Sequence, residues 1–248
     1  MSEVARDRLF LLVLAIAAWQ SVSMWTGADA LPAPVATLRH AAGMLVSGTF
    51  WREAAETMRV LMLSTALAAG LGLLFGLWLG TRPFAGAVAE PILVAIAALP
   101  KVTLYPVILL IFGLTLNAKV VFAALHGVVP IALFTIAGLR ATPRVFRQVG
   151  RAMKLGTVDI VRHILLPAAL PEIVSGLRIG ISLTLLGTLV AEMFAARSGL
   201  GFLLVQAIPR LDNQAILALT AIVFGAALML NVALMQLEAW LRAGAVAR

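Results

Sequence analysis

RATPRVFRQVGRAMKLGTVDIVR (Arg140–Arg162), followed by HILLPAALP (His163–Pro171), is a polar, basic island in an otherwise apolar sequence. Hydrophobic residues make up 62% of the 248 positions and charged residues only 12%. In soluble domains, hydrophobic residues average roughly one half of the positions and charged residues roughly one quarter. The composition therefore predicts an integral membrane protein, and we interpret the basic island as a surface that a partner protein can bind.

Six windows are apolar and long enough to cross a bilayer as helices, which takes about 20 residues each. They cover approximately 9–25, 60–80, 90–113, 118–139, 172–195 and 215–238. A cleaved signal peptide is the alternative for the first window, but Trp19, Gln20 and Trp25 do not resemble a cleavage site of small residues. The sequence thus predicts an all-α membrane protein with about six transmembrane helices, forming a single domain over 1–248.

The positions of the basic residues predict how these spans are oriented. With the amino terminus in the cytoplasm, eleven of the nineteen Lys and Arg residues lie inside and six outside, while Lys101 and Arg178 lie in the membrane. Cytoplasmic loops carry an excess of positive charge, so we expect a multi-pass protein of a bacterial inner membrane with both termini cytoplasmic. The net charge of +8 then indicates topology and contact with membrane lipid, and no nucleic-acid partner is expected.

Several kinds of chemistry are disfavoured by the residues that the chain carries. Cysteine is absent and no HExxH-like spacing occurs, so we expect neither a metal site nor a cofactor in this chain. An intramembrane hydrolase would need Ser64 or Ser182 beside His126, but no nucleophile motif surrounds either serine. An ion-gradient-driven secondary transporter is the alternative function; it would need acidic residues at mid-membrane, whereas here they lie mainly near the ends of the spans.

Glycines recur at intervals of four in two spans. Gly72, Gly76 and Gly80 lie in the second, and Gly176 and Gly180 in the fifth. This spacing lets helix backbones approach closely where lipid provides no hydrophobic drive. It is compatible with packing inside the chain and with an interface between subunits.

The basic island is predicted to fold as an elbow of two short helices. Thr142 and Pro143 are typical of a helix start, and the cations that follow recur at steps of three and four along one face. We expect Gly156 to end this helix and a second helix to run over Val158–Leu166 until Pro167, with Pro171 starting the next span. A loop lying among lipid headgroups is the alternative, but it needs neither a glycine joint nor exposed apolar faces, which usually mark an interaction site.

VGRAMKLG…HILLPAALP (Val149–Pro171) resembles the EAA loop of permease subunits from binding-protein-dependent ABC importers. SGLRIGISLTLLGTLVAEMFAARSGLGF (175–202), ALPKVTLYPVILLIFGL (98–114) and LPAP (31–34) are similar to the nitrate/sulfonate/taurine group of that family. Gly150 and Arg151 depart from the usual Glu and Ala of the motif, and the interval from Gly156 to Pro167 is about two residues short of it.

The resemblance implies a type I ABC importer permease fold with a coupling segment at about 142–171. This segment would seat in a groove of a separate cytoplasmic ABC ATPase, present in two copies that bind ATP and Mg²⁺. The residues that match the coupling motif are Ala152, Gly156, Leu166 and Pro167. The chain has no GxxxxGK[ST] loop of its own, which agrees with nucleotide hydrolysis by a partner.

The resemblance further implies a second permease copy in a homodimer, a periplasmic or extracellular solute-binding protein, and transport by alternating access. The expected cargo is a small anionic solute of the sulfonate, taurine, nitrate or carboxylate type. Neither the ATPase nor the binding protein is part of this chain, so this chain is expected not to be an enzyme.

Polar groups at membrane depth mark pathways, ion pairs or water-filled cavities. Lys101, between Pro100 and Pro106, is expected at the solute pathway, or alternatively bound to freed backbone carbonyls or to Glu192. Arg178 is expected to brace neighbouring segments near the inner leaflet.

The end of the fifth span is a candidate outer gate. Glu192 precedes Ser198 and Gly199 in a glycine-rich break, which can also be an ordinary turn. His126 shares a helix face with Lys119; a hydrogen-bonded core histidine is the plainer interpretation, and a place beside the pathway is the functional one. The predicted pathway or gate residues are Lys101, His126, Glu192, Ser198 and Gly199.

Overall fold

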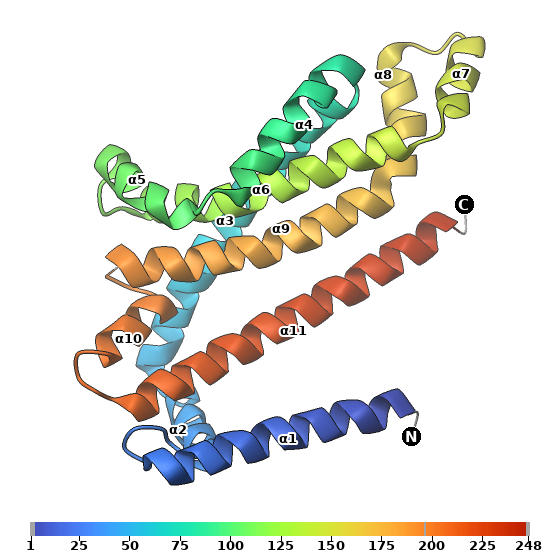
Figure 1. The fold of residues 1–248 in the computed structure, drawn as a ribbon. Helices are drawn as coiled ribbons and strands as arrows, with labels where there is room; N and C mark the ends of the chain where they lie inside the picture. Colours follow the sequence, from blue (N-terminus) through green and yellow to red (C-terminus); the bar gives the residue numbers. More distant parts are fainter. Residues whose placement is uncertain (1–2, 196, 247–248) are drawn as a thin grey trace.

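The computed structural model describes residues 3–195 and 197–246, which form helices and connecting turns with no strand among them (Figure 1). In chain order the elements are α1 (Glu3–Thr26), α2 (Pro34–Leu45), α3 (Gly48–Gly80), α4 (Pro83–Ala98), the 3₁₀ turn η1 (Lys101–Leu104), α5 (Tyr105–Phe112), α6 (Leu116–Ala141), α7 (Arg144–Ala152), α8 (Thr157–Ile160), the π-helical turn η2 (Val161–Leu165), α9 (Leu166–Ala195), α10 (Leu200–Ala207) and α11 (Asn213–Val246).

Within the described residues, five helical stretches are long and apolar enough to cross a membrane. They are Leu9–Thr26, Gly48–Gly80, Leu116–Ala141, Thr157–Phe194 and Asn213–Leu241. The sixth predicted span, at 90–113, is not one helix: α4 and η1–α5 meet the same criteria only as a pair, bent by 86°. Pro100 causes the break, because it has no amide hydrogen and forces Leu99 into an extended conformation (φ −65°, ψ 138°).

Helix α6 is the central helix of the bundle, and α3 packs along it through glycines. Cβ atoms placed on Gly72, Gly76 and Gly80 would meet Ile131, Thr135 and Leu139 of α6 at 2.7, 2.5 and 2.6 Å. The residue numbers on α3 and on α6 rise together along this contact, so the two helices run parallel. Only glycine lets the two backbones come this close.

Helix α9 packs against α6 in the same way but runs antiparallel to it. Gly176 lies against Phe134, Gly180 against Ile131, and Gly127 of α6 against the backbone of Gly180. All the glycines singled out in the sequence therefore face a helix of the same chain. The interpretation of the glycine spacing as packing within the chain is confirmed.

The bent pair α4–α5 must cross the bundle once, because the parallel helices α3 and α6 both end at the same end. Helix α4 starts at that end, where the Arg140 guanidinium forms an ion pair with Glu90. Helix α5 ends at Phe112, beside the start of α6 (Figure 1). Gly113, with a φ of 67°, then turns the chain toward α6. The described residues thus contain five candidate membrane helices, and six, the predicted number, if the bent pair counts as one span.

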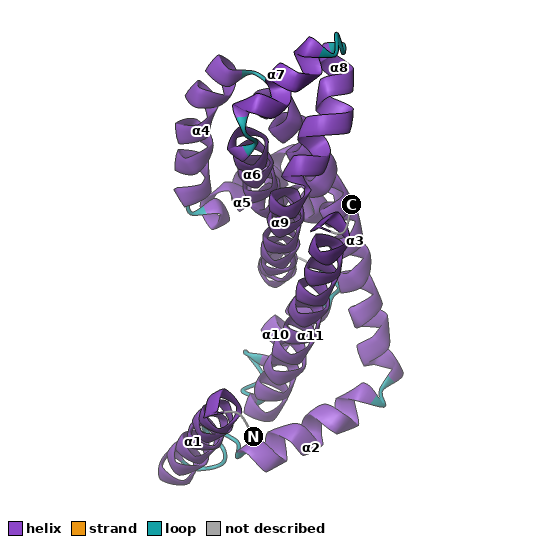
Figure 2. Ribbon diagram, turned by 90° about the vertical axis from the view of Figure 1, so that its right-hand side faces the viewer, coloured by secondary structure: helices purple, strands orange, loops and turns teal. Residues whose placement is uncertain are grey.

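The amino-terminal helix stands apart from the bundle. Figure 2 shows α1 separated from the α3–α6–α9 group, with α2 leading from it to α3. Trp19 Nε1 donates to Pro32 O (3.2 Å) and Ser23 Oγ to Leu31 O (2.7 Å), so the LPAP segment holds the end of α1. Helix α2 lies between the first two spans, and the second span begins earlier than predicted, at Gly48.

Gly76→Val should lower stability, because the valine methyl groups would overlap Thr135 and force α3 away from α6. Overpacking of this kind typically costs about 1–3 kcal/mol. Gly70→Val is the matched control on the same helix, since nothing lies within 4 Å of a Cβ there. The measurement is the thermal unfolding midpoint of each variant in detergent, and equal midpoints would contradict the proposed close packing.

Candidate functional site

The basic island forms an elbow that projects beyond the ends of α6 and α9 (Figure 1). Helix α7 ends where Lys154 takes a left-handed conformation (φ 55°), and the Leu155 amide donates to Gly150 O (3.0 Å). Gly156 is extended (φ −64°, ψ 158°), a conformation open to any residue, and it precedes α8. The prediction that Gly156 ends the first helix is therefore wrong in detail: the left-handed residue that stops α7 is Lys154.

The second part of the elbow is continuous with the fifth span. Helices α8, η2 and α9 follow one another without a break from Thr157 to Ala195, so the prediction that this helix ends at Pro167 is also wrong. The π-helical turn Val161–Leu165 directly precedes Pro167. A π turn widens the helix and changes its hydrogen-bond register, which lets a proline without an amide hydrogen follow without ending the helix.

The apolar residues of the elbow are divided between two surfaces. Ile160 and Leu165 are buried with Leu139, Ala169 and Ile173, so they fix the elbow to the bundle. Gly150 lets α7 fold closely onto this part, because a Cβ there would lie 2.9 Å from Ile160 and 3.0 Å from Ile164. The departure from the EAA pattern at this position thus has a steric reason.

The opposite surface of the elbow is apolar and open. Val145, Val149, Met153 and Val158 are 55%, 48%, 66% and 76% exposed. The side chains of Arg144, Arg147 and Arg151, which belong to the predicted cationic face, lie outside the described part of the structure. An exposed apolar face on a projecting segment is suited to binding another protein.

The predicted coupling residues lie at different depths in this elbow. Ala152 and Gly156 are exposed at its tip, and Pro167 is exposed on α9. Leu166 is half-buried and lines a groove of about 510 Å³ between α8 and the end of α3, together with Trp78 and Arg82. The Arg82 guanidinium stacks on Trp78, 5.1 Å from the ring centroid.

At the other end of the bundle, the predicted gate residues converge on a buried carboxylate. Glu192 is 1% exposed, and its Oε2 accepts from Thr57 Oγ1 (2.9 Å) and from the Gly201 amide (3.1 Å). The Leu200 amide donates in turn to Thr57 Oγ1 (2.8 Å). These bonds attach the turn between α9 and α10 to α3.

Gly199 and Ser198 complete this junction. Gly199 has a φ of 114°, which favours glycine, and its amide donates to Glu53 Oε2 (2.6 Å). Lys119 Nζ lies 3.5 Å from Ser198 Oγ. Glu192, Ser198 and Gly199 are thus brought together, whereas sequence reasoning missed Glu53 and Thr57, which come from α3 and lie more than 130 positions away.

Lys101 and His126 bond to the backbone of their own segments. Lys101 Nζ donates to Ala97 O (3.1 Å), a carbonyl freed where α4 ends, which favours the structural alternative for this lysine. His126 Nδ1 lies 3.0 Å from Phe122 O. Near them, the Tyr105 hydroxyl donates to Ala191 O (2.9 Å) and attaches α5 to α9. Their place beside the pathway stays a prediction.

Three further polar residues have structural partners. Arg178 Nε lies 2.7 Å from Glu238 Oε2, so α9 is braced against α11. Ser64 and Ser182, the serines considered for a hydrolase, donate to Val60 O (2.7 Å) and Arg178 O (3.0 Å). Each hydroxyl thus bonds along its own helix instead of to His126.

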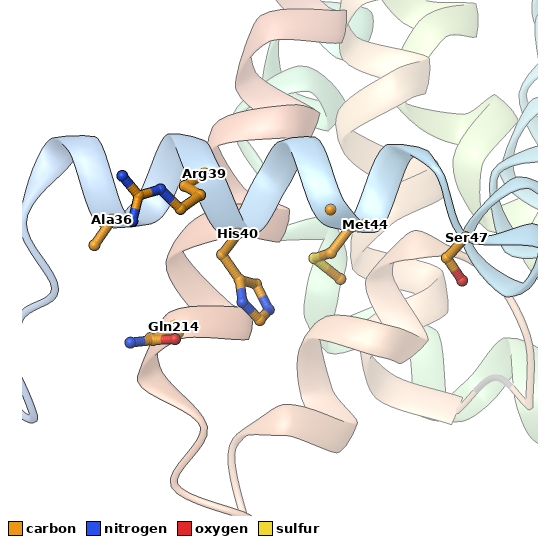
Figure 3. A pocket seen from close by; sticks show the side chains of 7 residues that line it. Ala36, Arg39, His40, Met44, Ser47 and Gln214 are labelled. Carbon is orange, nitrogen blue, oxygen red and sulfur yellow. The ribbon is translucent and has the colours of Figure 1, made fainter.

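A shallow hollow of about 650 Å³ lies between α2 and the start of α11. Figure 3 shows Arg39 and His40 on α2 and Gln214 on the facing segment. The hollow is at the end of the bundle that carries the α9–α10 turn, away from the elbow (Figure 1). The two ends of the molecule therefore differ: one has the apolar elbow, the other a polar junction and hollow.

Residues 68–245, which include both the elbow and the α9–α10 junction, match the family described as binding-protein-dependent transport system inner membrane component. This chain belongs to that family. It is a permease subunit of ABC importers, a multi-pass membrane protein, and no observation favours an ion-gradient-driven secondary transporter.

Relatives place the permease in the nitrate/sulfonate/taurine group, which residues 175–202, 98–114 and 31–34 suggested. The taurine transport permease TauC of Escherichia coli is 27% identical over 193 residues, covering 78% of this chain and 70% of TauC. The putative aliphatic sulfonates permease SsuC of Bacillus subtilis is 28% identical, covering 80% and 73%. The riboflavin permease RibX of Chloroflexus aurantiacus is 30% identical, covering 78% and 73%.

A solved structure confirms the fold of the permease. A chain of the inward-facing MetNI methionine ABC transporter superimposes with a TM-score of 0.67 at 22% sequence identity. The match covers 78% of this chain and 96% of that chain. The predicted all-helical importer permease fold is thereby confirmed.

Thr57→Val should loosen the α9–α10 turn, because the Leu200 amide loses its acceptor and the Glu192 carboxylate keeps only the Gly201 amide as a donor. We expect a loss of about 3 kcal/mol in stability and faster maleimide labelling of a single Leu204→Cys on α10 in this cysteine-free chain. Thr65→Val is the control on the same helix, since the buried Thr65 hydroxyl has no hydrogen-bond partner among the described residues. Equal labelling of the Thr57 and Thr65 variants would contradict the role of this junction.

Proposed function

We propose that this permease imports a small oxyanion-bearing solute, driven by two copies of a cytoplasmic ATPase that bind ATP and Mg²⁺ and grip the elbow. The observation that carries this proposal is the division of the elbow into a buried face and an open apolar face. The buried face, at Ile160 and Leu165, transmits force to the bundle, because α8 runs directly into the fifth span. The open face, at Val145 and Val149, is free to receive the partner.

The orientation follows from the same arrangement. The first and last helices both point their free ends toward the end that carries the elbow (Figure 1). If the elbow meets a cytoplasmic ATPase, both termini are cytoplasmic, in agreement with the distribution of basic residues. The α9–α10 junction and the hollow at Arg39 and His40 then face outward, where a solute-binding protein would deliver cargo.

A second permease copy, forming a homodimer, would cover the broken helix α4–α5. Backbone that leaves its helical hydrogen bonds at membrane depth is tolerated only against protein or in a water-filled cavity. The apolar side chains beside this break, such as Val94, Leu110 and Ile111, are 53%, 86% and 69% exposed in the single chain. The broken segment is thus suited to lie at a subunit interface or beside the solute pathway, near Lys101.

Transport would proceed by alternating access, as a shift between outward- and inward-open populations. Closure of the ATPases would displace the elbow, and α9 would carry the displacement to Glu192 and the α9–α10 junction. An oxyanion cargo is supported by the taurine, sulfonate and nitrate permeases among the relatives and by the cations at the outer end of the bundle.

Val149→Asp tests the elbow, because docking would bury the new carboxylate without a partner. We expect co-purification of the ATPase with the permease to fall by roughly ten-fold or more, with membrane insertion unchanged. Val46→Asp is the matched control, since Val46 is an exposed valine in the turn between α2 and α3, away from the elbow. Full ATPase retention by the Val149 variant, or transport by the permease without any ATPase in vesicles, would overturn the proposal.

A further inference from the structure

A small polar cavity of about 190 Å³ lies at the outer end of the bundle, between α3, the start of α6 and the α9–α10 turn. Its polar lining consists of the cations Arg59, Lys119 and Arg197, the hydroxyl groups of Thr115 and Ser198, and the carboxylate of Glu56. Three cations face one carboxylate, so the cavity is strongly positive. None of these residues belongs to the elbow.

Lys119 is the decisive residue, because its ammonium group is largely buried and forms no close ion pair among the described residues. The side chain is only 8% exposed, and its described polar contact is the Ser198 hydroxyl at 3.5 Å. Within the described residues, no carboxylate lies within 4.0 Å of its ammonium group. The Glu192 carboxylate acts on this ammonium group only from beyond ion-pair distance. A largely buried charge without a close partner is costly, so an anion in the cavity would stabilise it.

The surroundings of Lys119 also favour negative charge. Arg59 pairs with Glu56 only at 3.8 Å, and both side chains are well exposed, so water largely screens this contact. Thr115 and Leu116 bring the amino-terminal end of the 26-residue helix α6 to the cavity wall. The helix dipole adds partial positive charge at this end.

We propose that this cavity binds an oxyanion group, such as a sulfonate or a carboxylate, with Lys119 as its central ligand and Arg59, Arg197 and Ser198 around it. The volume accommodates the charged group of a small solute, since a water molecule occupies about 30 Å³. Binding of the anion stands on the cavity itself. That the cavity is the first binding site for incoming solute rests on the proposed import function.

The position of the cavity links its occupant to the outer junction. Ser198 directly precedes Gly199, whose amide is held by Glu53, and the next residues are held by Thr57 and Glu192. An anion shared by Lys119 and Ser198 would tie the start of α6 to the turn that α3 and α9 already hold. Occupancy would thus stabilise this arrangement of the outer end.

The test uses purified permease in an uncharged maltoside detergent. Sodium methanesulfonate and sodium nitrate are titrated against sodium chloride at matched ionic strength, and the thermal unfolding midpoint is followed. We expect an oxyanion-specific rise for the wild type, with an apparent affinity weakened about ten-fold or more by Lys119→Gln. Arg197→Gln, which changes an exposed cation, gives a milder second variant, and Arg210→Gln removes an exposed arginine that does not line the cavity.

A phospholipid headgroup carries the same oxyanion chemistry, so a second arm measures retention of phosphatidylglycerol against phosphatidylcholine by native mass spectrometry. Retention that is lost in the Lys119 and Arg197 variants would assign the site to a lipid phosphate, and a response to the free anions would assign it to solute. If the wild type shows neither response, or if both variants behave like the Arg210 variant, the proposal is overturned.

Uptake measurements on the assembled importer distinguish a failure of this anion site from a failure of the proposed import function. If uptake needs the ATPase but the Lys119 and Arg197 variants keep the wild-type KM, the cavity is not the first binding site for solute, and the import function stands. If the anion binds as expected but the permease needs no ATPase, the import proposal fails while the anion site remains.

Discussion

The close approach of α3 and α9 to the central helix α6 is the constraint on which the rest of the structure depends. In a bilayer, apolar side chains gain little by leaving lipid for protein, so helices associate through close backbone packing. Glycines on all three helices provide that packing, from Gly80 at one end of α6 to Gly187, which lies against Ala123 and His126, at the other. The three helices therefore form one closely packed unit over most of their length.

This unit connects the two functional ends of the permease. Helix α9 carries the elbow directly at one end and Glu192 at the other, while α3 borders the groove at Leu166 and holds the α9–α10 turn through Thr57. Packed cores and interfaces have discrete arrangements and do not deform continuously. A displacement of the elbow would thus reach the outer junction through packed helices and would not require a flexible relay.

The broken helix α4–α5 contrasts with this unit. Its first half is joined to α6 by Arg140 and Glu90, and its second half to α9 by Tyr105. Between these attachments the chain bends at Leu99 and Pro100, and most side chains of the segment face away from the chain's own core. A helix that is interrupted in lipid needs cover for its freed backbone groups, and this segment buries few of its side chains within the single chain.

The sequence by itself determined the membrane class, the permease family and the existence of the elbow, because apolar length, charge distribution and short motifs are local patterns. It could not show that α7 ends at Ala152 before a left-handed Lys154, that the helix continues through Pro167, or that the chain bends sharply near Pro100. Backbone geometry at those points depends on what packs against it. Only the tertiary structure brought Thr57 to Glu192, Glu53 to Gly199 and Lys119 to Ser198. Each of these contacts joins segments far apart in the chain, which no local sequence pattern relates.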